Sequence, residues 1–196
     1  MSTETVALTR REQMKADRRR QLLVAAGTLI AERGFMGVRL EDLGAAAGIS
    51  GPAVYRHFPN KEALLVELLV GISQRLLDGG TTVASQAGSP EQALDALIEF
   101  HLDFAFGEPD LIRIQDRDLE SLPDAARRQV RKTQRRYVEL WVRVLQQSDS
   151  TLDEQDARVK AHAIFGLINS TPHSASRSAP VHARNILRAM ATAALS

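Results

Sequence analysis

Apolar residues recur every three or four positions along most of the chain, which is the spacing of one face of an α-helix. They do not alternate with polar residues over any useful length, so the pattern does not predict strands. It predicts an all-α chain of about nine helices. The expected ranges are 15–33, 40–47, 50–57, 60–78, 90–107, a short segment after 109, 123–147, 151–169 and 180–196.

Glycine and capping residues set several of the expected helix ends. Gly34 and Gly48 follow the first two helices, and Asn60 is a good N-cap for the fourth. The Asp-Gly-Gly at 78–80 is expected to end that fourth helix. The Thr-Leu-Asp-Glu at 151–154 has the capping-box spacing and is expected to open the eighth helix.

Composition excludes several classes of protein. The 196 residues are 44% hydrophobic, which is enough for a folded core. The chain has no cysteine, which excludes disulfides, thiol catalysis and the common structural zinc sites and fits a reducing cytoplasm. The longest apolar stretch, residues 63–70, is interrupted by Glu67. We therefore expect a cytoplasmic protein without a membrane span.

Charge is unevenly distributed, although the net charge of the whole chain is only +1. Residues 1–61 contain ten Lys or Arg against six Asp or Glu, whereas the rest of the chain contains 15 against 18. A basic N-terminal third on an otherwise acidic chain favours a DNA-facing module joined to a part that does not touch DNA.

Three short helices in the first sixty residues, with a glycine turn at 47–49, have the dimensions of a helix-turn-helix. Gly48 tolerates the left-handed backbone of a sharp turn. Ser50 is expected to cap the third helix and to leave its N-terminal amides facing phosphates. Arg56 is the only long donor in this helix, so we expect it to read guanine. The arginine run at 18–20 is expected to reach a phosphate or the minor groove.

Residues 48–65, GISGPAVYRHFPNKEALL, closely resemble the signature of TetR-family transcriptional regulators. The segment 26–35 and the Leu-Glu-Asp-Leu of the second helix are also similar to the family, so the likeness covers roughly residues 16–70. The resemblance implies a helix-turn-helix DNA-binding domain at 1–62. By the same resemblance, the fourth helix joins this domain to a ligand-binding and dimerisation domain at 63–196.

The resemblance also implies which residues contact double-stranded operator DNA. The phosphate backbone is expected at Tyr55, His57 and Lys61. The bases are expected to be read by Gly51, Pro52, Ala53 and Arg56. Many family members have a threonine cap before the second helix, whereas this chain has Val38 and Arg39 there. Arg39 is expected to contact a phosphate or a base edge instead.

A small-molecule effector is expected to bind between the fifth, seventh and eighth helices, where an apolar stripe carries a few polar groups. The expected residues are Leu97, Phe100, His101, Phe104, Tyr137, Trp141, Val144 and Phe165. The competing interpretation is that these side chains fill the core. The stretch 101–123 is similar to regulators of acyl-CoA, fatty-acid or branched-chain amino-acid degradation, which implies an acyl-CoA or another apolar metabolite as the effector.

The last helix is apolar nearly all round, which a helix covering only its own domain does not need. We therefore expect a homodimer in which the last two helices of both subunits form a four-helix bundle. The expected interface residues are Ala161, Ile164, Phe165, Ile168, Leu187, Met190 and Ala194.

A second basic cluster lies on the seventh helix, at positions 127, 128, 131, 132, 135 and 136. Such a cluster fits a phosphorylated ligand. However, the acidic residues within 108–124 are ready ion-pair partners, so a salt-bridged, solvent-facing surface is the favoured interpretation.

No metal, cofactor or catalytic site is expected. The histidines at 101, 162 and 173 do not make the i, i+4 pair of a helical metal site, and no nucleophile elbow, phosphate loop or dinucleotide fingerprint occurs. The sequence predicts a non-enzymatic DNA-binding regulator, a repressor released from a palindromic operator by a small apolar or acyl-type effector. The alternative is a DNA-binding protein regulated by a protein partner.

Overall fold

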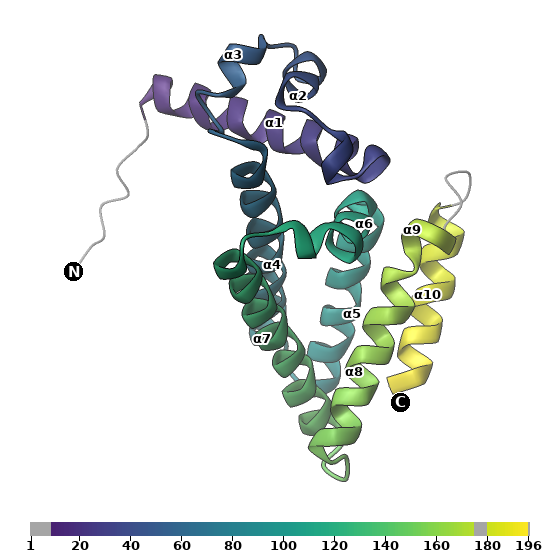
Figure 1. Ribbon diagram of the computed structural model, residues 1–196. Coiled ribbons are helices and arrows are strands. Elements are labelled where there is room, and N and C mark those ends of the chain that lie inside the picture. The colour runs from purple at the N-terminus through teal and green to yellow at the C-terminus, as the bar shows by residue number, and fades with distance from the viewer. Residues whose placement is uncertain (1–8, 175–179, 196) are drawn as a thin grey trace, which may run out of the picture. The chain divides into compact units, whose positions relative to one another are not determined.

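The computed structural model describes residues 9–174 and 180–195, and the regular structure in these residues is entirely helical (Figure 1). Its elements are α1 (Arg10–Arg33), the 3-10 turn η1 (Phe35–Gly37), α2 (Leu40–Ala46), α3 (Gly51–Val54), α4 (Lys61–Gln86), α5 (Pro90–Gly107), α6 (Pro109–Asp118), the turn η2 (Leu119–Ser121), α7 (Asp124–Ser148), α8 (Glu154–Asn169), α9 (Thr171–Ser174) and α10 (Pro180–Leu195). The predicted all-α fold is confirmed. Each predicted helix has a counterpart, and α9 is an addition.

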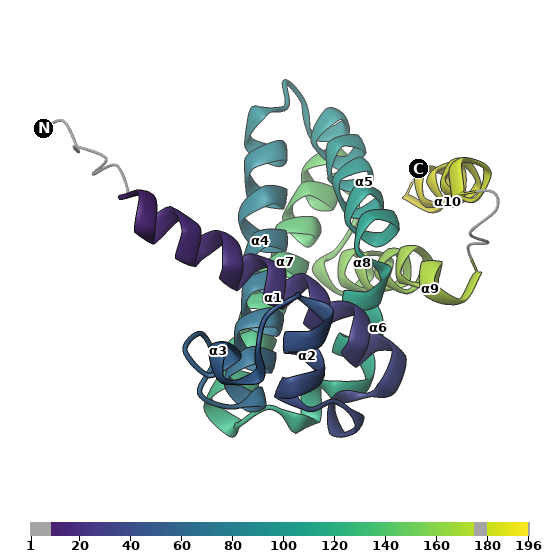
Figure 2. The ribbon, with the colours of Figure 1, turned by 90° about the horizontal axis from the view of Figure 1, so that it is seen from above.

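The chain divides into two compact units, residues 1–68 and 69–196, and α4 belongs to both. The domain boundary expected at residue 62 stays a prediction. In the first unit, α2 and α3 lie side by side next to α1 (Figures 1 and 2). The core of this unit is made of fully or almost fully buried apolar side chains, among them Leu22, Ile30, Phe35, Leu43, Val54, Phe58, Leu64 and Leu65.

Helix α1 begins at Arg10, five residues before its predicted start. Thr9 and Glu12 form a capping box there: the Thr9 Oγ1 accepts a hydrogen bond from the Glu12 amide, and the Glu12 carboxylate accepts one from the Thr9 amide. The helix ends where predicted, because Gly34 follows it with a φ of 78°.

The predicted end of α4 at the Asp-Gly-Gly of 78–80 is wrong, since the helix continues to Gln86. A Cβ atom on Gly79 would lie 2.3 Å from the Phe100 ring, and one on Gly80 would lie 2.5 Å from the Tyr137 ring. The two glycines therefore let the aromatic side chains of α5 and α7 approach the α4 backbone, and they do not stop the helix.

In the second unit, α7 packs against α5 and α8, and α10 packs against the same two helices. Trp141 of α7 is fully buried at the centre. Two arginines tie α10 to α5, with Arg184 paired to Glu99 at 2.8 Å and Arg188 paired to Asp95 at 3.0 Å.

The predicted capping box at 151–154 is also wrong. Thr151 turns back, and both its amide and its hydroxyl donate to Asp149. The N-cap of α8 is Asp153, whose carboxylate accepts a hydrogen bond from the Asp156 amide at 2.8 Å. Aspartate is as good an N-cap as threonine, so α8 still begins within three residues of the predicted position.

Candidate functional site

The turn between α2 and α3 brings the two helices into close contact. Gly48 has a φ of 66°, the left-handed conformation expected from the sequence. Gly44 was not singled out by the sequence, yet a Cβ atom there would lie 2.9 Å from the Ile49 carbonyl oxygen and 3.0 Å from Val54 Cγ2. The packing of α3 on α2 therefore requires a glycine at position 44.

The segment expected to read DNA is shorter as a helix than predicted. Regular α3 covers only four residues, and hydrogen-bonded turns carry the chain on to Phe58. Ser50 occupies the N-cap position, but its side chain makes no capping hydrogen bond, so that predicted bond is absent. Arg39 is the N-cap of α2, and its amide donates to the Asp42 carboxylate at 3.0 Å.

The structure places the predicted DNA-contact residues at the surface. Those that are exposed are Arg39, Ser50, Pro52, Tyr55 and Arg56, and those that are half-buried are Gly51, Ala53, His57 and Lys61. Val54 and Phe58, from the same segment, are completely buried. The apolar side chains of this segment thus fix it to the core, and the remaining side chains stay available to a ligand; their role in DNA contact stays a prediction.

Two of these residues already have partners within the unit. The Tyr55 hydroxyl donates to a Glu41 carboxylate oxygen at 3.0 Å, and this neighbouring carboxylate raises the pKa of Tyr55. The Lys61 ammonium donates to the Phe35 carbonyl at 3.3 Å and lies 4.6 Å from the centre of that ring. An ammonium has three donors, so Lys61 can hold this carbonyl and still offer protons to a phosphate.

His57 is half-buried, and its Nδ1 atom has no hydrogen-bond partner among the residues that the structure describes. Burial and the nearby positive charge of Arg19 lower the pKa of His57. The ring is therefore neutral at pH 7.

The arginine run at 18–20 does not act as a unit. The Arg19 guanidinium donates to both carboxylate oxygens of Glu67, with Nε at 2.7 and 2.9 Å, and to the His57 carbonyl. It also lies 4.1 Å from the centre of the Phe58 ring. Arg19 thus joins α1 to His57, near the end of the segment expected to read DNA, and to α4, and the expectation that the arginine run reaches DNA stays a prediction. A sequence separation of 48 residues hides this contact from local patterns.

A cavity of about 220 Å³ lies in the second unit, between α4, α5, α6, α7 and α8. Its lining residues are Ser73, Leu76, His101, Phe104, Ile112, Gln115, Gln134, Tyr137, Val138, His162, Phe165 and Asn169. By this measure a single water needs only ~10–15 Å³, so the space is large enough for a ligand.

Four of the eight predicted effector residues line this cavity, namely His101, Phe104, Tyr137 and Phe165. Phe100 instead packs on Gly79. Leu97, Trp141 and Val144 are buried and do not line the cavity. Three lining amides, Gln115, Gln134 and Asn169, were missed, because amide side chains on helices are usually at the surface. The assignment of an effector to this space stays a prediction.

The aromatic rings of His101, Phe104, Tyr137 and Phe165 form one wall of the cavity, and Trp141 packs against Phe165 without lining it. The ring centres of His101 and Phe165 are 5.0 Å apart, those of Trp141 and Phe165 are 5.1 Å apart, and those of Tyr137 and Phe165 are 5.5 Å apart. These tilted and edge-on contacts are the geometries that aromatic pairs prefer. Phe165 is thus a cavity residue at the centre of an aromatic cluster.

A chain of hydrogen bonds crosses this wall. The Tyr137 hydroxyl lies 3.4 Å from His101 Nδ1, and His101 Nε2 lies 3.1 Å from the Asn169 Oδ1. Desolvation by burial lowers the pKa of His101 to about 4, so its ring is neutral and carries one proton. Because Asn169 Oδ1 only accepts, that proton is on Nε2, and Nδ1 accepts from Tyr137.

The buried neutral histidine makes stability depend on pH. Its pKa is about 4 when folded and about 6.5 when unfolded, so the unfolded state binds more protons between these values. We expect the free energy of unfolding to fall by about 2 kcal/mol from pH 7.5 to pH 5 on account of His101 alone. Urea unfolding of the wild type and of His101→Gln at both pH values measures this difference, and equal pH dependence in the two proteins would contradict it.

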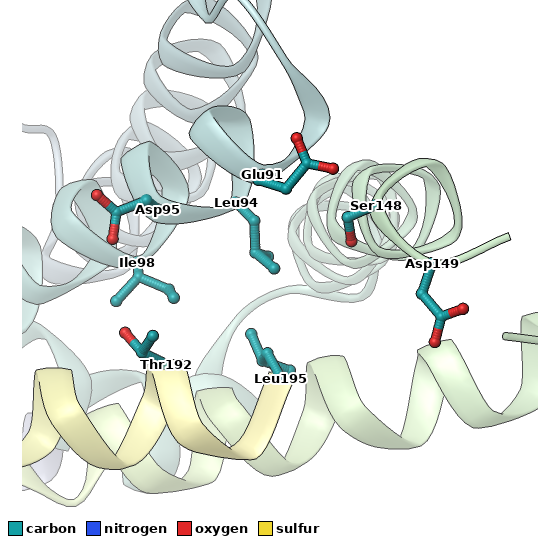
Figure 3. A pocket seen from close by; sticks show the side chains of 8 residues that line it. All are labelled: Glu91, Leu94, Asp95, Ile98, Ser148, Asp149, Thr192 and Leu195. Carbon is teal, nitrogen blue, oxygen red and sulfur yellow. The ribbon is translucent and has the colours of Figure 1, made fainter. Parts of the chain in front are cut away.

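A second cavity, of about 390 Å³, lies between the start of α5 and the ends of α7 and α10. Figure 3 shows Leu94, Ile98 and Leu195 pointing into the space, with carboxylates and hydroxyls at its edge. Its carboxylates already have partners: Glu91 accepts from Ser89, Asp95 from Arg188, and Asp149 from Thr151. The larger cavity therefore offers no free carboxylate among its described lining residues to orient a ligand.

The basic cluster on α7 is salt-bridged only in part. Arg127 and Arg131 pair with Glu120, and Arg127 also pairs with Asp124. In the part of the chain that the structure describes, no ion pair is formed by the other four basic residues. Glu108 and Asp110 pair elsewhere, with arginines outside α7. We call these four exposed residues the α7 basic strip, and they are Arg128, Lys132, Arg135 and Arg136.

The residues predicted to form a dimer interface are divided between the core and the surface. Ala161, Ile164, Ile168 and Leu187 are buried within their own chain, and Phe165 lines the cavity. Met190 and Ala194 are exposed. The apolar residues that α8 and α10 leave exposed include Val159, Ala163, Gly166, Ile186, Met190 and Ala194.

Residues 9–174 and 180–195 contain neither a metal-binding cluster nor a membrane-spanning helix. No group of three His, Asp or Glu side chains in these ranges has the arrangement to hold a metal ion. None of the described helices is both long and apolar enough to span a bilayer.

Residues 22–68 match the family model for bacterial regulatory proteins of the tetR family. Residues 87–195 match the model for a tetracyclin repressor-like C-terminal domain. This second match alone covers more than half of the chain.

Curated relatives include the HTH-type transcriptional repressor KstR2 of Rhodococcus jostii, with 34% identity over 84 residues, which is 43% of this chain and 41% of that protein. The HTH-type transcriptional regulator EthR of Mycolicibacterium smegmatis is 31% identical over 109 residues, or 55% and 50% of the two chains. The chain thus spans half or less of the length of these relatives.

Solved structures share the fold. A TetR-family regulator from Bordetella parapertussis superimposes with a TM-score of 0.82 at 20% identity, covering 91% of this chain and 94% of that one. The ketosteroid regulator KstR2 of Mycobacterium tuberculosis superimposes with a TM-score of 0.79 at 21% identity, covering 91% of this chain and 93% of that one.

Proposed function

The chain belongs to the tetR family of bacterial regulatory proteins, which are DNA-binding regulators of transcription, and from this premise we propose that it is a repressor released by a small apolar effector. The observation that supports a small-molecule effector is the cavity of about 220 Å³ in residues 69–196. A protein regulated only through its surface needs no such space. The cavity therefore favours regulation by a small ligand over regulation by a protein partner.

We propose that residues 50–57 of each subunit in a homodimer enter successive major grooves of a palindromic operator. Arg56 reads a base edge, while Tyr55, His57, Lys61 and Arg39 hold phosphates. This assignment is supported by the exposure of Arg39, Tyr55 and Arg56 and the partial exposure of His57 and Lys61. It is also supported by the complete burial of Val54 and Phe58 in the same segment. Such a protein acts in the bacterial cytoplasm, where the chromosome lies.

The same helix serves both sites in this proposal. Helix α4 begins at Lys61 and lines the cavity twelve residues later with Ser73, about 18 Å along its axis. An effector that prefers one position of α4 by about 1–3 kcal/mol shifts the population away from the DNA-binding state.

The effector is proposed to be an acyl compound, acyl-CoA among them. Two solved structures with this fold, at 19% identity, are AibR with isovaleryl coenzyme A and operator DNA (TM-score 0.72) and Bacillus subtilis FadR with stearoyl-CoA (TM-score 0.65). In this chain, the aromatic wall suits an acyl tail, and the α7 basic strip is a cationic surface suited to phosphates.

Filling the cavity tests the effector site. Val138→Trp is expected to retain operator binding and to lose release by acyl compounds, because the indole occupies the ligand space. Arg143→Trp, on an exposed position of the same helix, is the control and should behave as the wild type. Fluorescence anisotropy of labelled operator measures both properties. Normal release from Val138→Trp places the effector elsewhere, and an absence of release by any acyl compound favours a protein partner.

Dimerisation is proposed to use the exposed faces of α8 and α10. Ile186 and Met190 are 46% and 50% exposed and lie one turn apart. Ile186→Glu with Met190→Glu is expected to convert a particle of twice 21.5 kDa into a monomer in light scattering. Met36→Glu, an exposed apolar residue of the other unit, is the control. An intact dimer in the double variant would disprove this interface.

A further inference from the structure

The polar lining of the cavity around Tyr137 is made of amide, hydroxyl and imidazole side chains. It contains three amides, from Gln115, Gln134 and Asn169, besides a serine, a tyrosine and two histidines. Among the described residues that line it, none is Asp, Glu, Lys or Arg. Two cations of the lining helices are engaged elsewhere: the Arg113 guanidinium donates to Asp110 and the Pro172 carbonyl, and the Arg158 guanidinium donates to Glu139 and Glu154. The residues of the α7 basic strip are exposed and do not line the cavity.

The hydrogen-bond chain from Tyr137 through His101 fixes the orientation of one of these amides. The structure places the Asn169 carbonyl oxygen 3.1 Å from His101 Nε2, so this oxygen faces the imidazole. The amide nitrogen then points away from His101, and among the described residues neither of its protons has an acceptor. Asn169 is therefore a fixed donor beside the aromatic wall. Ser73 is not a competing donor, because its hydroxyl donates to the Leu69 carbonyl at 2.8 Å.

A half-buried amide donor in a cavity whose described lining contains no Lys or Arg distinguishes between two kinds of ligand. A carbonyl oxygen loses little on leaving water if it gains a hydrogen bond from the amide. A carboxylate loses its full hydration, and a neutral amide does not compensate for a buried charge. His101 does not supply the missing charge, because burial among aromatic rings keeps it neutral.

We propose that this cavity selects a neutral, hydrogen-bond-accepting head group, such as the carbonyl of an ester or thioester, over the corresponding carboxylate, and that Asn169 is the specificity-determining donor. The proposal rests on the proposed function, since it concerns the effector of the same site. It implies that an acyl thioester acts as an effector and that the free acid released by its hydrolysis does not.

Three probes that share a six-carbon chain test the selection: methyl hexanoate, hexanoate and 1-chlorohexane. Calorimetric titration of the full chain at pH 8 is expected to show at least tenfold tighter binding of methyl hexanoate than of hexanoate. Asn169→Leu is expected to lower the preference for methyl hexanoate over 1-chlorohexane by about fivefold, the effect of one net hydrogen bond of ~1 kcal/mol. Affinity for 1-chlorohexane should remain, which separates the lost donor from a damaged cavity.

One control variant completes the test. Gln155→Leu removes an exposed amide from the same helix, outside the cavity lining, and is expected to keep the preferences of the wild type. Binding of hexanoate as tight as that of methyl hexanoate overturns the proposal, as does an unchanged preference in Asn169→Leu. If none of the three probes binds, the effector cavity itself is wrong, whereas binding without discrimination overturns only the selection of neutral heads.

Discussion

Replacing Arg56 with alanine is expected to weaken operator binding by about tenfold or more and to relax base preference at one position in each half-site. The reason is that a bidentate arginine contact with guanine contributes about 1–3 kcal/mol of discrimination. Lys61→Gln is expected to act differently. It should weaken binding to all duplexes by similar factors and reduce the slope of log affinity against log salt concentration by about one. Anisotropy titrations with operator and scrambled duplexes at two salt concentrations measure both effects.

The choice of glutamine at position 61 matters because Lys61 also donates to the Phe35 carbonyl. Glutamine removes the charge and retains a donor, so a change in salt dependence reports the phosphate contact. Arg143→Ala, which removes an exposed charge from α7, is the control for a general loss of positive charge. Unchanged affinity in both Arg56→Ala and Lys61→Gln would remove the basis for the DNA-contact assignment.

Gly44→Ala is expected to destabilise the first unit by about 1–2 kcal/mol and to weaken DNA binding. Alanine gains about 1 kcal/mol in helix propensity over glycine. The new methyl group would nevertheless lie 2.9 Å from a backbone oxygen, which a side-chain rotation cannot relieve, so overpacking of ~1–3 kcal/mol outweighs the gain.

Gly71→Ala in α4 is the matched control for this substitution. No described atom outside the surrounding helix backbone lies within 4 Å of the position that the new methyl group would occupy. Only the propensity gain remains, and stability should rise by about 0.5–1 kcal/mol. Denaturant unfolding measures both changes: the free energy of unfolding should fall in Gly44→Ala and rise in Gly71→Ala. A stabilised Gly44→Ala would show that α2 and α3 pack less closely than described.

Helix boundaries were predictable where one residue decides them locally. Gly34 and Gly48 end helices with positive φ, and Asn60 accepts the expected capping hydrogen bond from the Ala63 amide. The prediction that Gly79 and Gly80 end α4 is wrong because the local sequence does not distinguish two roles of glycine. A glycine can end a helix, or it can leave room within a helix for an aromatic ring to pack on the backbone. Only the positions of the two aromatic rings packed on them distinguish the two cases.

The candidate sites were predictable to different extents for a similar reason. A helical stripe identifies the buried face of α5 but does not separate Leu97, which is in the core, from His101, which lines the cavity. Asn169 and Arg19 were not recognisable locally because their roles depend on partners 68 and 48 residues away. Long-range packing therefore decides which polar side chains are structural and which remain available to a ligand.

The most direct test of the central claim is a selection of duplexes from random DNA by the purified full chain, followed by sequencing of the bound fraction. We predict enrichment of a palindrome whose half-site centres are separated by about one helical turn, ~10 base pairs, or a multiple of it. The enriched palindrome should lose preference at one position per half-site in Arg56→Ala. A bound fraction with no enriched sequence, or with one that Arg56→Ala leaves unchanged, would contradict the account.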